Sequence, residues 1–214
     1  MSDVRGGTYR SEVGALAVLR RYEELLAAWP VPAQHTRVPT REGETFVVTC
    51  GPAGAPPLVL LHGSGAYAAW FDDVLDGLGV GRFSAVGVSL GGWLALDHAI
   101  RRPGRAERLA LLCPSGVGRQ RVLPLLAALP LLALGERGRR RAMRMAVGPA
   151  PDADPAIGAY TLLIHRSFRP RGGRVPVFTD EALRGLTARL LPEAGHVLPG
   201  QTTEIMEFLE ARRG

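Results

Sequence analysis

Ser89 stands between two glycines, in the pentapeptide GVSLG of residues 87–91. An apolar run over residues 83–88 precedes it, and a helical pattern over residues 90–101 follows it. A serine at such a strand-to-helix turn adopts a strained conformation that exposes its hydroxyl, and its neighbours must be small because the two backbones crowd there. The pattern therefore indicates a nucleophile at a helix N-terminus, which stabilises negative charge nearby. The alternative is an ordinary glycine-rich turn.

A second apolar run also ends at a polar turn. Residues 58–61 (LVLL) lead directly into His62-Gly63-Ser64-Gly65. The backbone N–H of Ser64 and that of Leu90 could together bind the oxyanion that forms when a serine attacks a carbonyl carbon. A tight strand-to-helix turn with a structural His62 is the other interpretation.

His196 is the best candidate for a general base. It lies in the loop segment AGH of residues 194–196, before the final helical pattern. A neutral imidazole within hydrogen-bonding distance of Ser89 would take the proton of the hydroxyl. Ser89 and His196 are therefore the predicted catalytic pair, and a solvent-facing loop histidine is the alternative for His196. The other four histidines lack such a setting: His35, His62, His98 and His165.

The elements that must position these residues alternate between strands and helices. Apolar runs at residues 58–61, 83–88 and 108–113 are typical of buried parallel strands. Helical spacing over residues 67–78 and 90–101 separates them, so the middle of the chain predicts a parallel α/β sheet. Further elements are predicted as a helix over 11–29, a turn-rich segment over 30–45, a strand over 45–50, a helix from Asp180, and a last helix from Thr202.

The domain organisation follows from length and composition. A chain of 214 residues is long enough for one domain with a buried core, so residues 1–214 are predicted as a single domain. Residues 115–180 are rich in Leu, Arg, Pro and Gly, with helix-like pieces and no clear strand. We expect this segment to form a helical cap, or lid, over the sheet.

Composition and charge argue against several partners. The formal net charge is +6 and all 26 basic residues are arginine, but the densest run, residues 137–144, contains no aromatic residue. A solvated helix face explains that run better than a nucleic-acid patch, although an arginine-rich nucleic-acid binder is the weaker alternative.

The longest apolar stretch, residues 122–134, is too short to span a bilayer. With no signal-peptide pattern, we expect a soluble cytoplasmic protein without a membrane partner. No metal site or cofactor is implied.

Together these segments resemble the α/β-hydrolase superfamily and, within it, bacterial carboxylesterase-like hydrolases. The resemblance implies a mostly parallel sheet flanked by helices, a helical lid and a small-molecule ester substrate. It also implies that Ser89 is the nucleophile and His196 the base, with the N–H groups of Ser64 and Leu90 as the oxyanion hole. The segments that carry it are residues 25–32 (LLAAWPVP), 56–65 (PPLVLLHGSG), 67–79 (YAAWFDDVLDGLG), 87–96 (GVSLGGWLAL), 177–183 (VFTDEAL) and 194–198 (AGHVL).

The chain departs from this family pattern in two places. After Ala66, a helix–strand unit of roughly 30 or more residues is absent. After Thr187, the strand that ends in the aspartate of the catalytic triad is absent. The sheet is therefore predicted to be shortened by two strands. In serine proteases, loss of this acid lowers kcat by roughly 10⁴-fold but leaves residual catalysis.

Three carboxylates are considered as replacements for the acid. Asp180 and Glu181 lie where the 115–180 segment returns toward the sheet, and Glu193 lies three residues before His196. A helix-capping role suits Asp180 better.

Two function hypotheses follow. In the first, the protein is a serine hydrolase that cleaves a carboxylic ester, weakened by loss of the triad acid. Carbon–carbon bond hydrolases and perhydrolases of this fold share the Ser-His-Asp set and stay open as variants of it. In the second, the protein is a catalytically inactive, truncated hydrolase-fold remnant or a ligand-binding protein.

Overall fold

The computed structural model describes most of the chain. The described residues are 8–62, 68–118, 130–131, 133–135, 137–138, 141–142, 155–169, 175–184 and 202–211. Contacts define two compact units. One combines residues 1–32 with 128–174, and the other combines residues 33–127 with 175–214. The predicted division into one domain with a cap over residues 115–180 stays a prediction.

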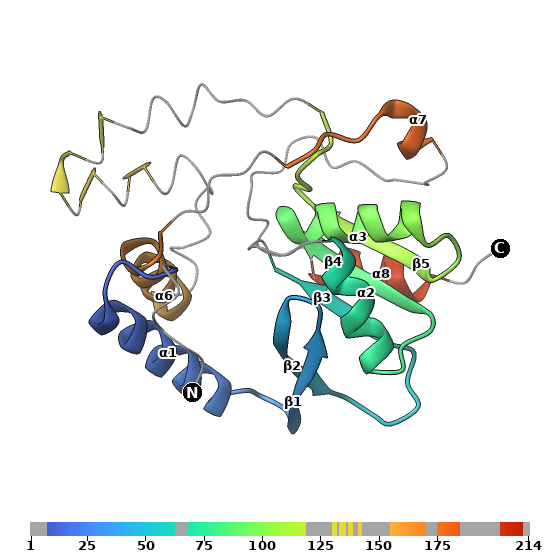
Figure 1. The fold of residues 1–214 in the computed structure, drawn as a ribbon, viewed down its shortest axis with the longest axis horizontal. Coiled ribbons are helices and arrows are strands. Elements are labelled where there is room, and N and C mark those ends of the chain that lie inside the picture. The colour runs from blue at the N-terminus through green and yellow to red at the C-terminus, as the bar shows by residue number, and fades with distance from the viewer. Residues whose placement is uncertain are drawn as a thin grey trace. The chain divides into compact units, whose positions relative to one another are not determined.

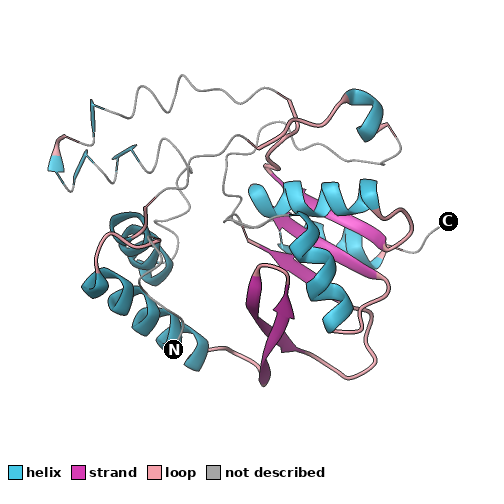
Figure 2. Cartoon of the chain, in the orientation of Figure 1, coloured by secondary structure: helices cyan, strands magenta, loops and turns pink. Residues whose placement is uncertain are grey.

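A three-stranded parallel sheet organises the second unit (Figures 1 and 2). Its strands are β3 (Leu58–Leu61), β4 (Phe83–Val88) and β5 (Ala106–Leu112), in the order β3-β4-β5. Helices α2 (Ala68–Gly77) and α3 (Leu90–Arg101) cover one face, and α8 (Thr202–Glu210) lies on the other (Figure 1). The parallel α/β arrangement is confirmed, with β3, β4 and α3 at their predicted bounds.

The register of this sheet aligns the strand ends. Leu61 pairs with Gly87 across β3 and β4, and Val88 pairs with Leu112 across β4 and β5. The carboxyl ends of the three strands therefore lie at one edge. Loops at this edge carry the ligand sites of open parallel sheets.

The core packs between the sheet and the helices α2 and α3. Five residues are completely or almost completely buried: Phe71, Leu75, Phe83, Ala85 and Ala95. The Phe71 and Phe83 rings meet edge to face, with centroids 5.9 Å apart. Alternate residues of β4 are buried because its side chains point in turn to its two faces. This packing holds the start of α3 against the end of β4.

An antiparallel hairpin precedes the parallel sheet. Strands β1 (Ala33–Thr40) and β2 (Gly43–Cys50) pair along their whole length, and the turn ends at Gly43, whose φ is 106°. The expectation of a turn-rich segment over 30–45 was therefore wrong. Only Val38 of β1 is buried, so the strand lacks a period-two apolar pattern and is stabilised by pairing with β2.

Two long helices pack together in the first unit. The helices α1 (Glu12–Ala27) and α6 (Pro155–Ser167) pack together, and Ser11 caps α1 by accepting a 3.1 Å hydrogen bond from the Gly14 N–H. An isolated bridge pairs Tyr9 with Phe168, whose rings meet at 4.6 Å. The predicted N-terminal helix is confirmed. No helix within the described ranges is long and apolar enough to cross a membrane.

Candidate functional site

Ser89 immediately follows β4 and has an unusual backbone. Its φ of 53° and ψ of −113° place a non-glycine residue in the left-handed half of conformational space. Such conformations cost about 1–3 kcal/mol and persist only where surrounding contacts enforce them. The Ser89 N–H donates to the Leu112 carbonyl at 2.9 Å, and the Ser89 carbonyl accepts from the Ser115 N–H at 2.9 Å. Both contacts tie this residue to the carboxyl end of β5.

Glycines allow the chain to approach itself closely around this turn. A Cβ at Gly87 would lie 2.7 Å from the Gly91 carbonyl oxygen. A Cβ at Gly91 would lie 2.2 Å from the Leu61 carbonyl oxygen, and one at Gly92 would lie 2.8 Å from Pro114. Because real Cβ atoms do not approach other atoms this closely, α3 can begin here only with glycine at these positions. We call residues 87–92 the serine turn.

The serine turn presents the N-terminus of α3. The first backbone N–H groups of a helix, starting with Leu90, have no partner within the helix and carry a partial positive charge. The Ser89 side chain makes no capping hydrogen bond to them. The arrangement can therefore stabilise negative charge close to a serine hydroxyl that does not cap the helix.

Of the four predicted site residues, the structure describes two, Ser89 and Leu90. Ser89 and Leu90 are adjacent at the serine turn, and the end of β3 lies against them, since a Gly91 Cβ would also lie 2.7 Å from the His62 carbonyl oxygen. Ser64 and His196 lie outside the described residues. Their predicted roles, like those of Ser89 and Leu90, stay predictions.

A contact cluster that the sequence did not reveal adjoins the serine turn. The indole Nε1–H of Trp93 donates to the Pro176 carbonyl at 2.9 Å, and the indole stacks on Phe178 with centroids 5.6 Å apart and planes at 22°. The Phe178 N–H donates to the Gly116 carbonyl at 2.9 Å. Gly116 has a φ of 78°, and a Cβ there would lie 2.4 Å from the indole. No sequence signal links these residues, which lie up to 85 positions apart.

The returning segment leads into α7 (Asp180–Leu183). The Thr179 hydroxyl oxygen caps this short helix by accepting a 3.2 Å hydrogen bond from the Ala182 N–H. Asp180 is the first helical residue, so the predicted capping role of Asp180 was wrong. Asp180 and Glu181 are exposed, and Glu193 lies outside the described residues.

A buried acid–histidine pair joins α2 to α3. His98 is completely buried, and its Nδ1 lies 2.8 Å from Oδ1 of Asp72, which also accepts hydrogen bonds from Arg101. Burial lowers the pKa of His98, and the hydrogen bond to Asp72 only partly offsets this. His98 is therefore neutral at pH 7 and donates through Nδ1. Because it lies in the last turn of α3, nine residues after Ser89, we assign the pair a structural role.

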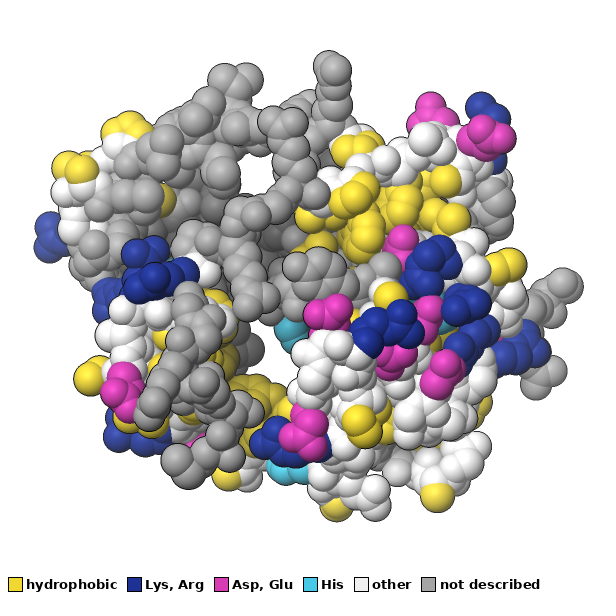
Figure 3. All heavy atoms as spheres, viewed as in Figure 1, with side chains coloured by type: hydrophobic (Ala, Val, Ile, Leu, Met, Phe, Trp, Pro, Cys, Tyr) yellow, Lys and Arg dark blue, Asp and Glu magenta, His cyan; other side chains and the backbone are white. Residues whose placement is uncertain are grey.

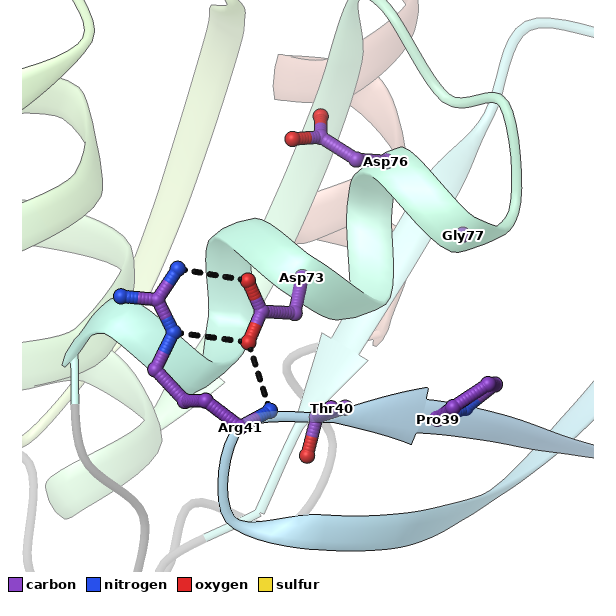
Figure 4. A pocket seen from close by; sticks show the side chains of 6 residues that line it. All are labelled: Pro39, Thr40, Arg41, Asp73, Asp76 and Gly77. Carbon is purple, nitrogen blue, oxygen red and sulfur yellow. Dashed lines mark hydrogen bonds and ion pairs between the residues drawn. The ribbon is translucent and has the colours of Figure 1, made fainter.

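A shallow hollow of about 550 Å³ lies between the hairpin turn and the end of α2 (Figure 4). Arg41 points at Asp73 and donates to both of its carboxylate oxygens, at 2.7 and 2.8 Å, which lowers the pKa of Asp73 to about 2. The hollow is lined by Pro39, Thr40, Arg41, Asp73, Asp76 and Gly77.

None of the residues that line this hollow belongs to the serine turn. The end of α2 precedes the amino end of β4, whereas Ser89 follows the carboxyl end of that strand. The hollow is therefore separate from the candidate site. Within the described ranges, no three metal-binding side chains are grouped to hold a metal ion.

Comparison with known proteins places the chain near bacterial carboxylesterases. No family model matches it. It is 32% identical over 135 aligned positions to the carboxylesterase Nap of Bacillus subtilis (strain 168), a match that covers 44% of this chain and 45% of that protein. It is 25% identical over 227 aligned positions to the carboxylesterase YbfK of the same organism, covering 82% of this chain and 75% of the relative. The chain thus spans less than half of the first relative's length and three-quarters of the second's.

Solved structures agree with these relatives. The crystal structure of carboxylesterase CesB (YbfK) from Bacillus subtilis superposes with a TM-score of 0.67, at 25% identity, and covers 82% of this chain and 78% of the other. Naproxen esterase from the same organism gives a TM-score of 0.66 at 26% identity, covering 81% and 77%. The chain therefore has the α/β-hydrolase fold and is similar to bacterial carboxylesterases.

Proposed function

We propose that the protein is a serine hydrolase that cleaves small-molecule carboxylic esters at the serine turn. The observation that carries the proposal is the strained backbone of Ser89, held at the carboxyl end of β4 and at the N-terminus of α3. A nucleophile requires a serine held at such a turn between strand and helix, and the strain has no other evident use in the fold. The relatedness to carboxylesterases supports an ester as the substrate.

The proposed reaction has two steps. The Ser89 oxygen attacks the ester carbonyl carbon while His196 takes the hydroxyl proton, and the N–H groups of Ser64 and Leu90 stabilise the oxyanion. Collapse expels the alcohol, which receives the proton from His196, and leaves Ser89 acylated. Water, deprotonated by His196, then attacks the acyl carbon; the carboxylic acid is released as the Ser89 oxygen leaves and takes the proton back from His196.

We further propose that the chain lacks two internal segments of its relatives, after Ala66 and after Thr187. The alignments support a shortened interior. The first alignment is 135 positions long but includes only 44% of the 214 residues, so it contains gaps in this chain. The second alignment is 227 positions long, which is more than the number of residues in the chain, so it contains gaps as well. Because the triad aspartate is lost, we expect kcat to be roughly 10⁴-fold lower than in an enzyme that keeps the complete triad.

The same observation favours a second candidate function. A hydrolase fold without its triad acid can persist as a ligand-binding protein or an inactive remnant that retains the serine turn by descent. This alternative predicts a folded protein whose Ser89 has no more reactivity than an ordinary surface serine.

We also propose that the protein is cytoplasmic and binds no nucleic acid.

Labelling with a fluorophosphonate separates the two candidates. We expect the purified protein to gain the mass of one adduct, and the Ser89→Ala variant to gain none. The adduct forms in the first half of the reaction, so the test does not depend on rapid release of the acyl group. Folded protein that acquires no adduct, or an adduct that persists in Ser89→Ala, would overturn the catalytic proposal in favour of the second.

A further inference from the structure

We propose that Trp93 and Phe178 form an apolar wall beside Ser89 that selects esters with a bulky apolar group, such as a long alkyl chain or an aromatic ring. The inference rests on the proposed function, because it takes Ser89 as the nucleophile. It assigns specificity to a pair of residues that belong to different parts of the sequence and meet only in the fold.

The geometry of α3 places the indole next to the nucleophile. Trp93 is four residues after Ser89, and residues four apart lie on the same face of a helix. Long side chains on a helix point back toward its N-terminus, so a residue covers the turn that precedes its own Cα. The Trp93 side chain therefore covers the turn that begins at Ser89.

The contacts of the indole fix the side on which it lies. The indole contacts Gly116, donates a hydrogen bond to the Pro176 carbonyl and stacks on the Phe178 ring. Residues 113–116 leave the carboxyl end of β5, and the Ser115 N–H bonds directly to the Ser89 carbonyl at 2.9 Å. The wall therefore stands on the β5 side of the nucleophile, at the sheet edge where the ester must bind.

The wall is held in place before any ligand arrives. Trp93 loses rotational freedom to the hydrogen bond with Pro176 and to the stack on Phe178. Phe178 is fixed in turn by its backbone bond to Gly116. Preorganised apolar surfaces lose little entropy on binding, which favours their use in recognition.

The surface around the pair is apolar and exposed. Val117 and Val177, the chain neighbours of Gly116 and Phe178, are 43% and 57% exposed. Figure 3 shows hydrophobic side chains gathered over α3 on its side toward α7. An apolar surface that continues from a nucleophile fits the apolar part of its substrate, whereas a charged or strongly polar ester would be desolvated there without compensation.

The rate of labelling by two fluorophosphonates tests the inference without requiring release of the acyl group. One reagent carries an ethyl chain and the other a decyl chain. In the parent protein we expect the decyl reagent to label Ser89 faster. In Phe178→Ala we expect the decyl-to-ethyl ratio of rate constants to fall about tenfold, with the ethyl rate changed less than threefold.

Two further variants control for loss of structure. Trp93→Phe keeps an aromatic ring for the stack but removes the hydrogen bond to Pro176, and should retain most of the preference. Trp29→Ala truncates an exposed aromatic residue at the end of α1, in the other unit, and should leave the ratio unchanged. An unchanged ratio in Phe178→Ala, or an equal fall of both rates, would overturn the specificity role while Ser89 labelling stands. Absence of labelling by either reagent in the parent would overturn the proposed function itself.

Discussion

Gly91 limits what the serine turn can tolerate, because a Cβ there would lie 2.2 Å from a backbone oxygen of β3. In Gly91→Ala, α3 must move away from the end of β3, and we expect this overpacking to reduce the free energy of unfolding by about 1–3 kcal/mol. A displacement near 1 Å at a nucleophile lowers reactivity by about a hundredfold. Labelling rates with a fluorophosphonate, together with urea unfolding, measure both effects.

Gly81→Ala is the matched control. Gly81 lies in the loop before β4, and a Cβ at this position would have no other atom within 4 Å. We expect this variant to label and unfold like the parent. Labelling of Gly91→Ala at the parental rate would contradict the idea that crowding at the serine turn positions the nucleophile.

Local pattern was enough to predict the serine turn but not its surroundings. The run before Ser89 and the helical spacing after it are contiguous signals, and both β4 and α3 have their predicted bounds. The contact of Trp93 with Phe178 depends on how a segment far along the chain returns, and no local propensity encodes that. The structural role of His98 likewise depends on its hydrogen bond to Asp72, which lies 26 positions earlier on another helix.

At the scale of elements, the pairing of α2 with α3 depends on a buried charge. Burial raises the pKa of the Asp72 carboxyl, but hydrogen bonds from Arg101 and His98 outweigh this, and the pKa is lowered overall. In Asp72→Asn, these donors lose a charged acceptor, and we expect the free energy of unfolding at pH 7 to fall by about 2 kcal/mol. Asp97→Asn, which removes a carboxylate bound to Arg101 of the same helix, should cost less than about 0.5 kcal/mol.

The same cluster predicts how stability depends on pH. The lowered pKa of His98 means that the unfolded chain binds a proton near pH 6.5 while the folded protein does not, so stability falls as the pH drops below about 6.5. The lowered pKa of Asp72 adds stability above about pH 4 that is lost as the pH falls toward its folded pKa. The guanidinium groups of Arg101, Arg102 and Arg105 also face this pair.

Urea unfolding at a series of pH values measures both windows. In Asp72→Asn, the loss of stability below about pH 4 should shrink, while the loss below about pH 6.5 should remain. A pH dependence identical to that of the parent in both windows would contradict this assignment.

Elements with a buried face were the ones that sequence predicted well. One face of β3, formed by Val59 and Leu61, packs against the core, as does α2, and both elements are found within one residue of the predicted bounds. Strand β1 was missed because it is stabilised by backbone pairing, with mostly exposed polar side chains that carry no such pattern.

At the scale of the whole molecule, β3 lies at the edge of the described parallel sheet, on the side that a longer sheet would cover. Within the described part of the chain, β3 pairs with β4 alone and the β1–β2 hairpin forms a separate sheet. Leu60 of β3 is 67% exposed. The proposed loss of a helix–strand unit after Ala66 explains such an edge, because the sequence of β3 still carries the apolar residues of a strand that is paired and covered on both sides.

An apolar strand edge with unpaired backbone groups promotes association between copies, and a lysine on it opposes that association. We therefore expect sedimentation velocity to show self-association of the parent that grows with concentration and is weakened in Leu60→Lys. Leu134→Lys is the matched control, since Leu134 has the same 67% exposure but belongs to the other unit. If the parent stays monomeric at every concentration, or both lysine variants dissociate it equally, β3 is not an exposed edge, and the missing unit must be replaced by another part of the chain. If only Leu60→Lys dissociates it, the shortened sheet folds and associates through the side from which a strand has been lost.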